Sequence, residues 1–258
     1  MDYKFNLKRD EKDERDYKFS RTISPHSDLV LPKRVDLREK CPPIYDQGKL
    51  GACTAFTGCA CREMLLDEKE TLSELFLYYV ERDLNGDVKK DSGASLRDTC
   101  KAINKIGVCE EKLMPYNIEK FDHHPGRHAV INASKYRISA YKSLASLDEI
   151  KQNLTFRQQP VMIGMDVYES FKSKETAETG IMFMPRKDEK KLGGHAVLVV
   201  GYKDVPKKRG YYNKHNNNNS GYLIIRNSWG ENWGDKGYFY MPYEYADSDY
   251  TYDYWIME

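Results

Sequence analysis

Cys53 is the residue whose position in this sequence best suits nucleophilic chemistry. It follows Gly51-Ala52 and begins an apolar segment whose spacing predicts a helix. A helix N-terminus presents unpaired backbone N–H groups and the positive end of the helix dipole, and both stabilise a thiolate. The thiolate is the reactive form of cysteine, so this position suits a nucleophile. A buried, inert cysteine is the alternative interpretation when the residue is taken alone.

A base and a residue that orients it are suggested further along the chain. His195 follows Gly193-Gly194 and is the first residue of an apolar, strand-like run. The start of such a strand is a suitable place for a proton acceptor that faces a cleft. Asn227 follows another strand-like run, and its amide oxygen could fix the plane and tautomer of an imidazole. Trp229 could shield that hydrogen bond from water. An ordinary strand-end histidine and a core tryptophan remain the alternatives.

Gln47 lies in a turn-rich loop six residues before Cys53. A side-chain amide there, together with the backbone N–H of Cys53, would form an oxyanion hole for a carbonyl under attack. Taken alone, Gln47 would be interpreted as an ordinary turn residue.

Three separate motifs resemble the papain-like (cathepsin-type, peptidase family C1) cysteine peptidases. They are Gln47 with Cys53, then Gly194-His195-Ala196, then Asn227-Ser228-Trp229-Gly230. The spacing from Cys53 to His195 falls inside the range of about 130–150 residues given for that family. The resemblance extends over residues 31–243. It implies that Cys53, His195, Asn227 and Gln47 are the catalytic set.

The same resemblance implies where a substrate would bind and where this chain departs from the family. Gly93-Ala94 looks like the glycine pair that binds the substrate backbone, and Gly194 and Trp229 are assigned to substrate as well. Leu50 replaces a cysteine that family members use for a structural disulfide, and Thr54 replaces an aromatic residue. This combination is similar to bacterial and viral branches rather than to lysosomal cathepsins.

Hydrophobic periodicity predicts a helical first half and a strand-rich second half, hence an α+β fold. With the resemblance, we expect a two-lobed papain-like fold in which a helical left lobe (about 36–138) and an antiparallel, β-barrel-like right lobe (about 139–245) flank the active-site cleft. A capping box at 146–149 opens a helix that must end before Pro160. The other predicted helices cover 53–68, 73–84 and 95–106, and the predicted strands cover 161–167, 195–202, 222–226 and 238–241.

Residues 1–30 form a charged segment with little apolar periodicity, here called the arm, ahead of a peptidase domain at 31–258. We expect the arm to act as a short inhibitory pro-segment of a zymogen by lying in the cleft. Phe19–Pro25 is its least charged part and the predicted plug. A tail packed elsewhere or disordered is the alternative. Residues 204–220 are expected to form an exposed insertion, with the basic triplet 207–209 as a solvated loop.

Composition bounds the possible partners. The 41 basic and 40 acidic residues give a net charge of +1, which offers no reason to expect nucleic acid or a membrane as partner. The sequence shows no run of about 18 apolar residues and no secretory signal peptide. Six cysteines without paired C-x-x-C motifs indicate neither a metal site nor a dense disulfide framework, and favour a reducing compartment, intracellular or virion. If Cys53 is free, at least one of Cys41, Cys59, Cys61, Cys100 and Cys109 is also unpaired within the chain.

The sequence therefore predicts a cysteine peptidase, in particular an endopeptidase, that hydrolyses peptide or protein substrates through a covalent acyl-enzyme. No cofactor is expected, and a monomer is favoured. The first alternative is a catalytically silent papain-like module that binds peptides or proteins. The second keeps the Cys-His-Asn machinery for acyl transfer, as transglutaminase-like folds do. Labelling by an epoxide thiol inhibitor would separate peptidase from silent module.

Overall fold

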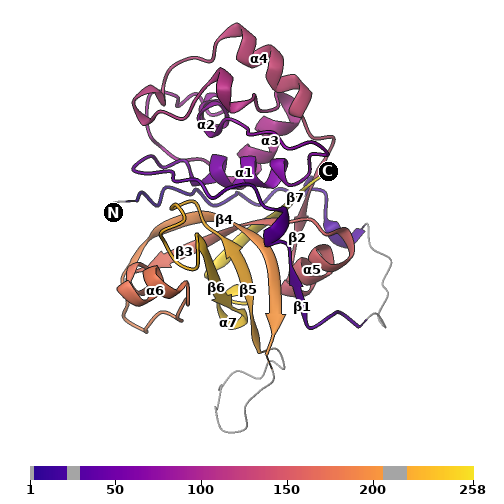
Figure 1. Cartoon of the computed structure of the whole chain (residues 1–258), viewed down its shortest axis with the longest axis vertical. Helices are drawn as coiled ribbons and strands as arrows, with labels where there is room; N and C mark the ends of the chain where they lie inside the picture. The colour runs from indigo at the N-terminus through magenta and orange to yellow at the C-terminus, as the bar shows by residue number, and fades with distance from the viewer. Residues whose placement is uncertain (1–2, 22–29, 206–219) are drawn as a thin grey trace.

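The computed structural model describes residues 3–21, 30–205 and 220–258. A group of helices stands over one antiparallel sheet, so the chain has the predicted α+β architecture with a helical and a strand-rich lobe (Figure 1). Among the described residues no helix is long and apolar enough to cross a membrane. The described cysteines, which are all six, are free.

The helical lobe is built around one buried helix. α1 (Cys53–Glu63) is almost entirely buried, because it packs against helices on one side and against the sheet on the other. α2 (Glu74–Asp83) and α3 (Leu96–Lys105) begin after Ser73 and Ser95, whose hydroxyl oxygens accept backbone N–H groups in the first turn. These three helices match the predicted ones. The lobe also contains α4 (Arg127–Ala133), which was not predicted.

The strand lobe is a single sheet with the order β2-β7-β3-β4-β5-β6, with β1 paired to β4. It stays open, since β2 and β6 lie at opposite ends of that path. The four predicted strands are present as β3 to β6. β1, β2 and β7 were missed, and β7 extends the strand lobe beyond residue 245. The bounds are β1 (Arg34–Asp36), β2 (Tyr141–Leu144), β3 (Val161–Tyr168), β4 (Lys191–Asp204), β5 (Gly221–Arg226), β6 (Tyr238–Pro242) and β7 (Thr251–Met257).

The predicted capping box is half formed. The Ser146 hydroxyl accepts the Glu149 backbone N–H at 3.2 Å, whereas the Glu149 carboxylate accepts the N–H of Ala145 rather than that of Ser146. The helix α5 (Leu147–Gln152) continues as a π-helical turn to Arg157 and ends before Pro160, as expected. Two further short helices, α6 (Lys174–Thr179) and α7 (Tyr243–Ala246), lie on the strand lobe.

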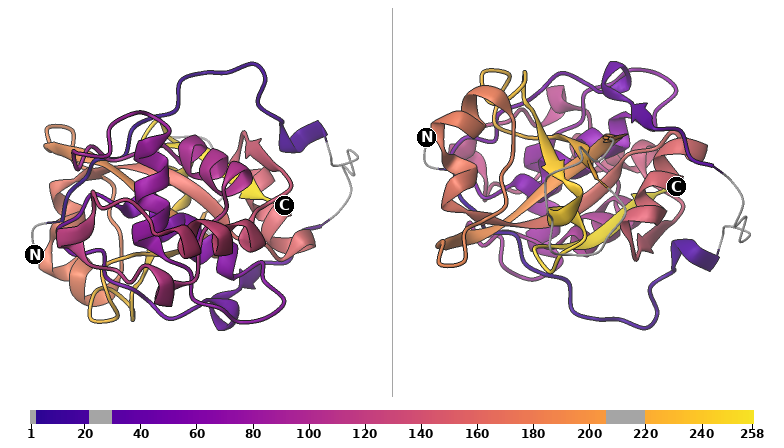
Figure 2. Two further views of the ribbon diagram at one scale, coloured as in Figure 1. Left: turned by 90° about the horizontal axis from the view of Figure 1, so that it is seen from above. Right: turned by 90° about the horizontal axis from the view of Figure 1, so that it is seen from below.

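The arm runs between the two lobes rather than away from them (Figure 1). It enters beneath α1, and a short 3₁₀ helix at Phe19–Arg21 lies at the opposite end of the molecule from residue 3 (Figure 2). Leu7 and Phe19 belong to the hydrophobic core, so the expectation that the arm stands apart from the core was wrong for these side chains.

The predicted plug was also wrong where it is described. Phe19 is fully buried against the strand lobe, where the preceding Lys18 bridges to Ser143 of β2, and the Arg157 guanidinium lies 5.0 Å from the Phe19 ring. The low charge around Phe19 therefore reflects burial against the strand lobe rather than entry into the cleft. The rest of the proposed plug, residues 22–25, and the basic triplet 207–209 lie outside the described residues.

Candidate active site

Cys53 is the first residue of α1, and this position leaves backbone N–H groups available to its thiol. The preceding Ala52 offers no side-chain cap to the helix. Burial raises the pKa of Cys53 to about 12, and hydrogen bonds from the backbone N–H groups of Ala196 and Thr54 act in the opposite direction. The thiol therefore lies beside the residue that follows His195, on the other lobe.

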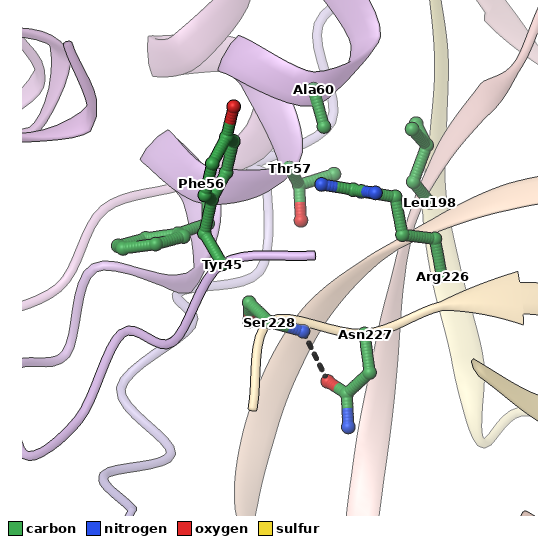
Figure 3. Close-up of a pocket in the computed structure, with 8 residues that line it drawn as sticks. All are labelled: Tyr45, Phe56, Thr57, Ala60, Leu198, Arg226, Asn227 and Ser228. Atoms are coloured by element: carbon green, nitrogen blue, oxygen red, sulfur yellow. Dashed lines mark hydrogen bonds between the residues drawn. The ribbon is translucent and has the colours of Figure 1, made fainter. Parts of the chain in front are cut away.

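His195 lies on β4, fully buried, and its Nε2 is 2.8 Å from Asn227 Oδ1. The same amide oxygen accepts the backbone N–H of Ser228 at 2.9 Å, drawn as the dashed line in Figure 3. An atom that accepts this N–H is the oxygen of the amide, so Nε2 must donate to it. The arrangement fixes the neutral tautomer with its proton on Nε2 and leaves the lone pair on Nδ1.

Nδ1 of His195 has no hydrogen-bond partner among the described residues. It is therefore the ring nitrogen that remains for the Cys53 proton. Burial lowers the pKa of His195 to about 4, while the bond to Asn227 raises it. With the thiol pKa raised and the imidazole pKa lowered, this state of the site favours a neutral thiol and a neutral imidazole rather than an ion pair.

Trp229 covers the histidine from one side. Its ring stacks on His195 with centroids 5.1 Å apart and an interplanar angle of 26°. Only 3% of Trp229 is exposed, so the indole excludes water from the face of the imidazole.

Gln47 is fully buried and held in one orientation. Its Oε1 accepts the hydroxyl of Ser228 at 2.6 Å, and its Nε2 donates to the Leu50 carbonyl at 3.0 Å. The backbone N–H of Gln47 also donates to the Ser228 carbonyl at 2.9 Å. The loop before α1 is thus tied to the loop that carries Asn227, and the amide keeps one further N–H.

A second tie between the lobes lies at a small pocket where α1 meets β4 and β5 (Figure 3). Arg226, directly before Asn227, lines this pocket with Phe56 and Leu198. Its guanidinium donates to the carbonyls of Pro42 and Pro43 at 2.6 and 2.5 Å. These bonds fix the strand end that carries Asn227 against the loop that carries Gln47.

The backbone groups assigned to substrate are occupied by the arm. The N–H of Lys8 donates to Ala94 O at 3.0 Å, and the N–H of Leu7 donates to Gly194 O at 3.2 Å. The N–H of Gly194 in turn donates to Phe5 O at 3.3 Å. The arm therefore lies in the cleft as an added extended strand, which is how a groove of this kind binds a peptide.

Gly93 permits the close approach of the arm. Its φ is +68°, and a Cβ at this position would lie 2.0 Å from Asn6 O. A side chain on residue 93 would therefore both strain the backbone and expel the arm.

Aromatic side chains of the arm also cover His195 and Trp229. Tyr3 stacks on Trp229 with centroids 4.5 Å apart and an interplanar angle of 6°. Phe5 lies edge-on to His195 at 6.2 Å and to Trp229 at 5.9 Å. The arm thus contributes to the burial that shifts the pKa of His195.

Two carboxylates near the site, the fully buried Glu81 and the partly buried Asp91, were not predicted from the sequence. Glu81 accepts the hydroxyls of Thr54 and Thr99 at 2.8 and 2.5 Å, and burial raises its pKa to about 8. Thr54, which departs from the family pattern, is thus one of the two residues that donate hydrogen bonds to Glu81. Asp91 lies beside the arm. The sequence offered one signal for each residue. Glu81 is an acidic residue within an apolar helical segment, and Asp91 is an acidic residue just before Gly93.

The chain belongs to the papain family of cysteine proteases, whose family model matches residues 31–253. It is 38% identical over 242 residues to an uncharacterized peptidase C1-like protein of Acanthamoeba polyphaga mimivirus, covering 88% of this chain and 73% of that protein. It is 29% identical to human cathepsin L2 over 81% of this chain and 60% of cathepsin L2. The chain thus spans less than two thirds of the cathepsin's length.

Among solved structures, the fold is similar to that of Xylellain, a cysteine protease from Xylella fastidiosa. The TM-score is 0.85 at 32% identity, with 100% of this chain and 97% of Xylellain covered. Viral and bacterial relatives are therefore among its similar proteins, as the sequence departures indicated. A papain-family protease acts on peptides or proteins.

Proposed function

We propose that this protein is a cysteine endopeptidase in which Cys53 is the nucleophile, His195 the base and Asn227 the residue that orients it. The observation that carries the proposal is the bond from His195 Nε2 to Asn227 Oδ1, which reserves Nδ1 for a thiol placed at the start of α1. This is the nucleophile, base and orienting-group arrangement of covalent catalysis.

The reaction follows from these positions. Nδ1 of His195 takes the proton of the Cys53 thiol, and the sulfur adds to the substrate carbonyl carbon. The remaining N–H of Gln47 and the backbone N–H of Cys53 stabilise the oxyanion that forms. His195 then gives its proton to the departing amine, which leaves a thioester. Water, deprotonated by His195, attacks the thioester, releases the acid and restores the thiol.

The path of the arm supports cleavage within a chain. Its extended segment continues on both sides of His195, from Tyr3 on Trp229 to Lys8 on Ala94. A groove that holds residues on both sides of the reacting groups suits an endopeptidase.

We also propose that the arm is inhibitory. It bonds to Ala94 and Gly194, the backbone groups that a substrate would use. Turnover therefore requires residues 3–8 of the arm, here called the cleft segment, to leave the cleft, and in this respect the chain resembles a zymogen.

A fluorogenic peptide library tests the proposal with the full chain and two full-chain variants, Cys53→Ala and Cys61→Ala. Cys61 is a matched control, because it is a buried free cysteine of the same helix whose pKa burial also raises to about 12. We expect Cys53→Ala to lose at least about a thousandfold in kcat/KM with unchanged thermal unfolding, and Cys61→Ala to retain activity. Wild-type turnover by Cys53→Ala would refute the proposal, and binding without turnover by the wild type would indicate a silent module.

A further inference from the structure

Asp91 is an acidic residue at the cleft that neither the mechanism nor the family resemblance uses. Its Oδ1 accepts the Tyr78 hydroxyl at 2.5 Å and the backbone N–H of Gly51 at 3.0 Å. The Lys4 ammonium of the arm lies 2.6 Å from the other oxygen, Oδ2. The backbone N–H of Gly51 also lies 3.3 Å from Oδ2. The carboxylate is thus held in place mainly through Oδ1, and Oδ2 accepts the cation of the chain that occupies the cleft.

The cation that pairs with Asp91 comes from the arm. Among the described residues, Lys4 is the only basic side chain in an ion pair with Asp91. Asp166 provides a contrast, because it pairs with Arg9 of the arm at 3.1 Å but also with Lys191 of the strand lobe at 2.8 Å. When the cleft segment lifts, Asp166 keeps an ion-pair partner in Lys191, whereas Asp91 loses its ion-pair partner Lys4.

We propose that Asp91 forms a subsite for a lysine or arginine side chain of the substrate. This inference rests on the proposed peptidase function and names the substrate class of the same cleft. With the arm in place the Asp91 side chain is 12% exposed and fixed by two donors, so departure of the arm uncovers this carboxylate. A basic side chain of a peptide that replaces the arm restores the missing charge-assisted hydrogen bond.

The position of Lys4 defines where the basic residue stands. Lys4 lies between Tyr3, which stacks on Trp229, and Phe5, whose ring meets His195. The Asn6 side chain next along the arm also donates to the Asp91 carbonyl at 2.9 Å. The preferred substrate therefore carries its basic residue within about two positions of the scissile bond.

The same contact makes the substrate a competitor of the arm. Lys4 and a substrate lysine need the same oxygen of Asp91, so both cannot bind at once. Basic peptides should therefore open the cleft more effectively than neutral peptides of the same shape.

Binding is measured first, without chemistry, in the full chain carrying Cys53→Ala and Phe5→Ala. The probes are peptides in which one lysine is moved stepwise through the sequence, each matched to a peptide with norleucine at that position. We expect one or two positions at which lysine binds about tenfold more tightly than norleucine. Asp91→Asn, added to this background, should reduce that ratio to near one.

Tyr78→Phe is the matched control for the support of Asp91. It removes the donor to Oδ1 and keeps the carboxylate charge, so affinity falls for both peptides while the ratio stays within about twofold. If Asp91 only holds the loop that contains Gly51, Asp91→Asn should change the affinities for the lysine and norleucine peptides equally. If the Cys53→Ala, Phe5→Ala protein, which retains Asp91, binds lysine and norleucine peptides equally or binds neither, the proposed subsite is refuted.

Turnover of the same peptides by Phe5→Ala with Cys53 intact separates the two proposals. A lysine preference in both binding and kcat/KM supports both. A preference in binding without any turnover retains the subsite and refutes the peptidase.

Discussion

The arm has two halves, and they are held by different chemistry. The cleft segment, residues 3–8, is bound by backbone hydrogen bonds to Ala94 and Gly194 and by ring contacts to Trp229 and His195. These are contacts that any extended peptide with suitable side chains could make in its place. The lysines in this segment are largely exposed.

The anchor segment, residues 10–19, is bound by side chains specific to this chain. Asp10 accepts the indole N–H of Trp255 at 2.8 Å, and Asp16 pairs with Arg97 at 2.6 Å with both side chains mostly buried. Phe19 is fully buried. We infer that the cleft segment lifts while the anchor stays, so the arm remains tethered beside the cleft at high effective concentration.

Phe19→Ala is expected to have the largest effect, because it breaks the anchor. Removing a fully buried phenylalanine should lower the free energy of unfolding by about 3–5 kcal/mol. Tyr17→Ala is the control, since Tyr17 is 71% exposed and should change stability by less than about 0.5 kcal/mol. Denaturant unfolding of the two variants checks this. Equal stabilities would mean that the anchor segment is not part of the folded core.

This contrast limits the use of deletions. Removing residues 1–28 takes Phe19 and Asp10 along with the cleft segment, so lost stability would obscure released activity. Substitutions within residues 3–8 leave the anchor in place.

Asn227→Ala changes the chemistry without touching either half of the arm. It removes the acceptor of His195 Nε2–H but neither the nucleophile nor the base. We expect kcat/KM to fall about tenfold to a hundredfold, well short of the loss in Cys53→Ala. Steady-state kinetics on one fluorogenic peptide checks this, and a loss as large as that of Cys53→Ala would assign Asn227 more than an orienting role.

The residues proposed to be catalytic could be singled out from the sequence because their signals are local. Cys53 follows a turn and starts an apolar helix, His195 begins an apolar strand, and Asn227 follows another. The sequence motif and the secondary structure predicted around it therefore indicate the same residues. The arm was predicted to enter the cleft, but through the wrong segment. Tyr3 and Phe5 stand in a charged stretch, and only the placement of Trp229 and His195 in the fold shows that aromatic rings bind there.

Elements that depend on distant partners were missed. β7 contains an aspartate with φ +55° and alternates little, yet it pairs with β2 and β3 and buries Trp255. β1 is three residues long and, within the described part of the chain, pairs only with β4. Asp91 resembles any polar loop residue until Gly51, Tyr78 and Lys4 converge on it. Periodicity does not register such pairings, since they are set by tertiary contacts.

The pH dependence of kcat/KM should separate the covered from the uncovered cleft. With the arm in place, burial raises the Cys53 pKa to about 12 and lowers the His195 pKa to about 4, so the neutral pair loses no proton at moderately alkaline pH. The thiol pKa of Cys53 is higher in the covered form than in the uncovered form, so the covered form is stabilised at any pH below the lower of the two values. This stabilisation is lost as the pH rises toward the thiol pKa of the covered form, about 12. In the uncovered cleft we expect a thiolate and an imidazolium, whose proton leaves at lower pH.

Because kcat/KM reports the free enzyme, Phe5→Ala should give a bell-shaped profile whose alkaline limb lies at lower pH than that of the wild type. Profiles measured from about pH 5 to about pH 10 with a neutral peptide check this. Coincident alkaline limbs would show that the arm does not control the ionisation of the pair.

Labelling by a peptidyl epoxide, followed by mass spectrometry of the full chain, shows whether the cleft segment of the arm covers a reactive Cys53. We expect Cys53 alone of the six cysteines to be labelled, severalfold faster in Phe5→Ala than in the wild type, with Tyr17→Ala labelled at the wild-type rate. Labelling spread over the other cysteines, or equal rates in Phe5→Ala and the wild type, would contradict this expectation.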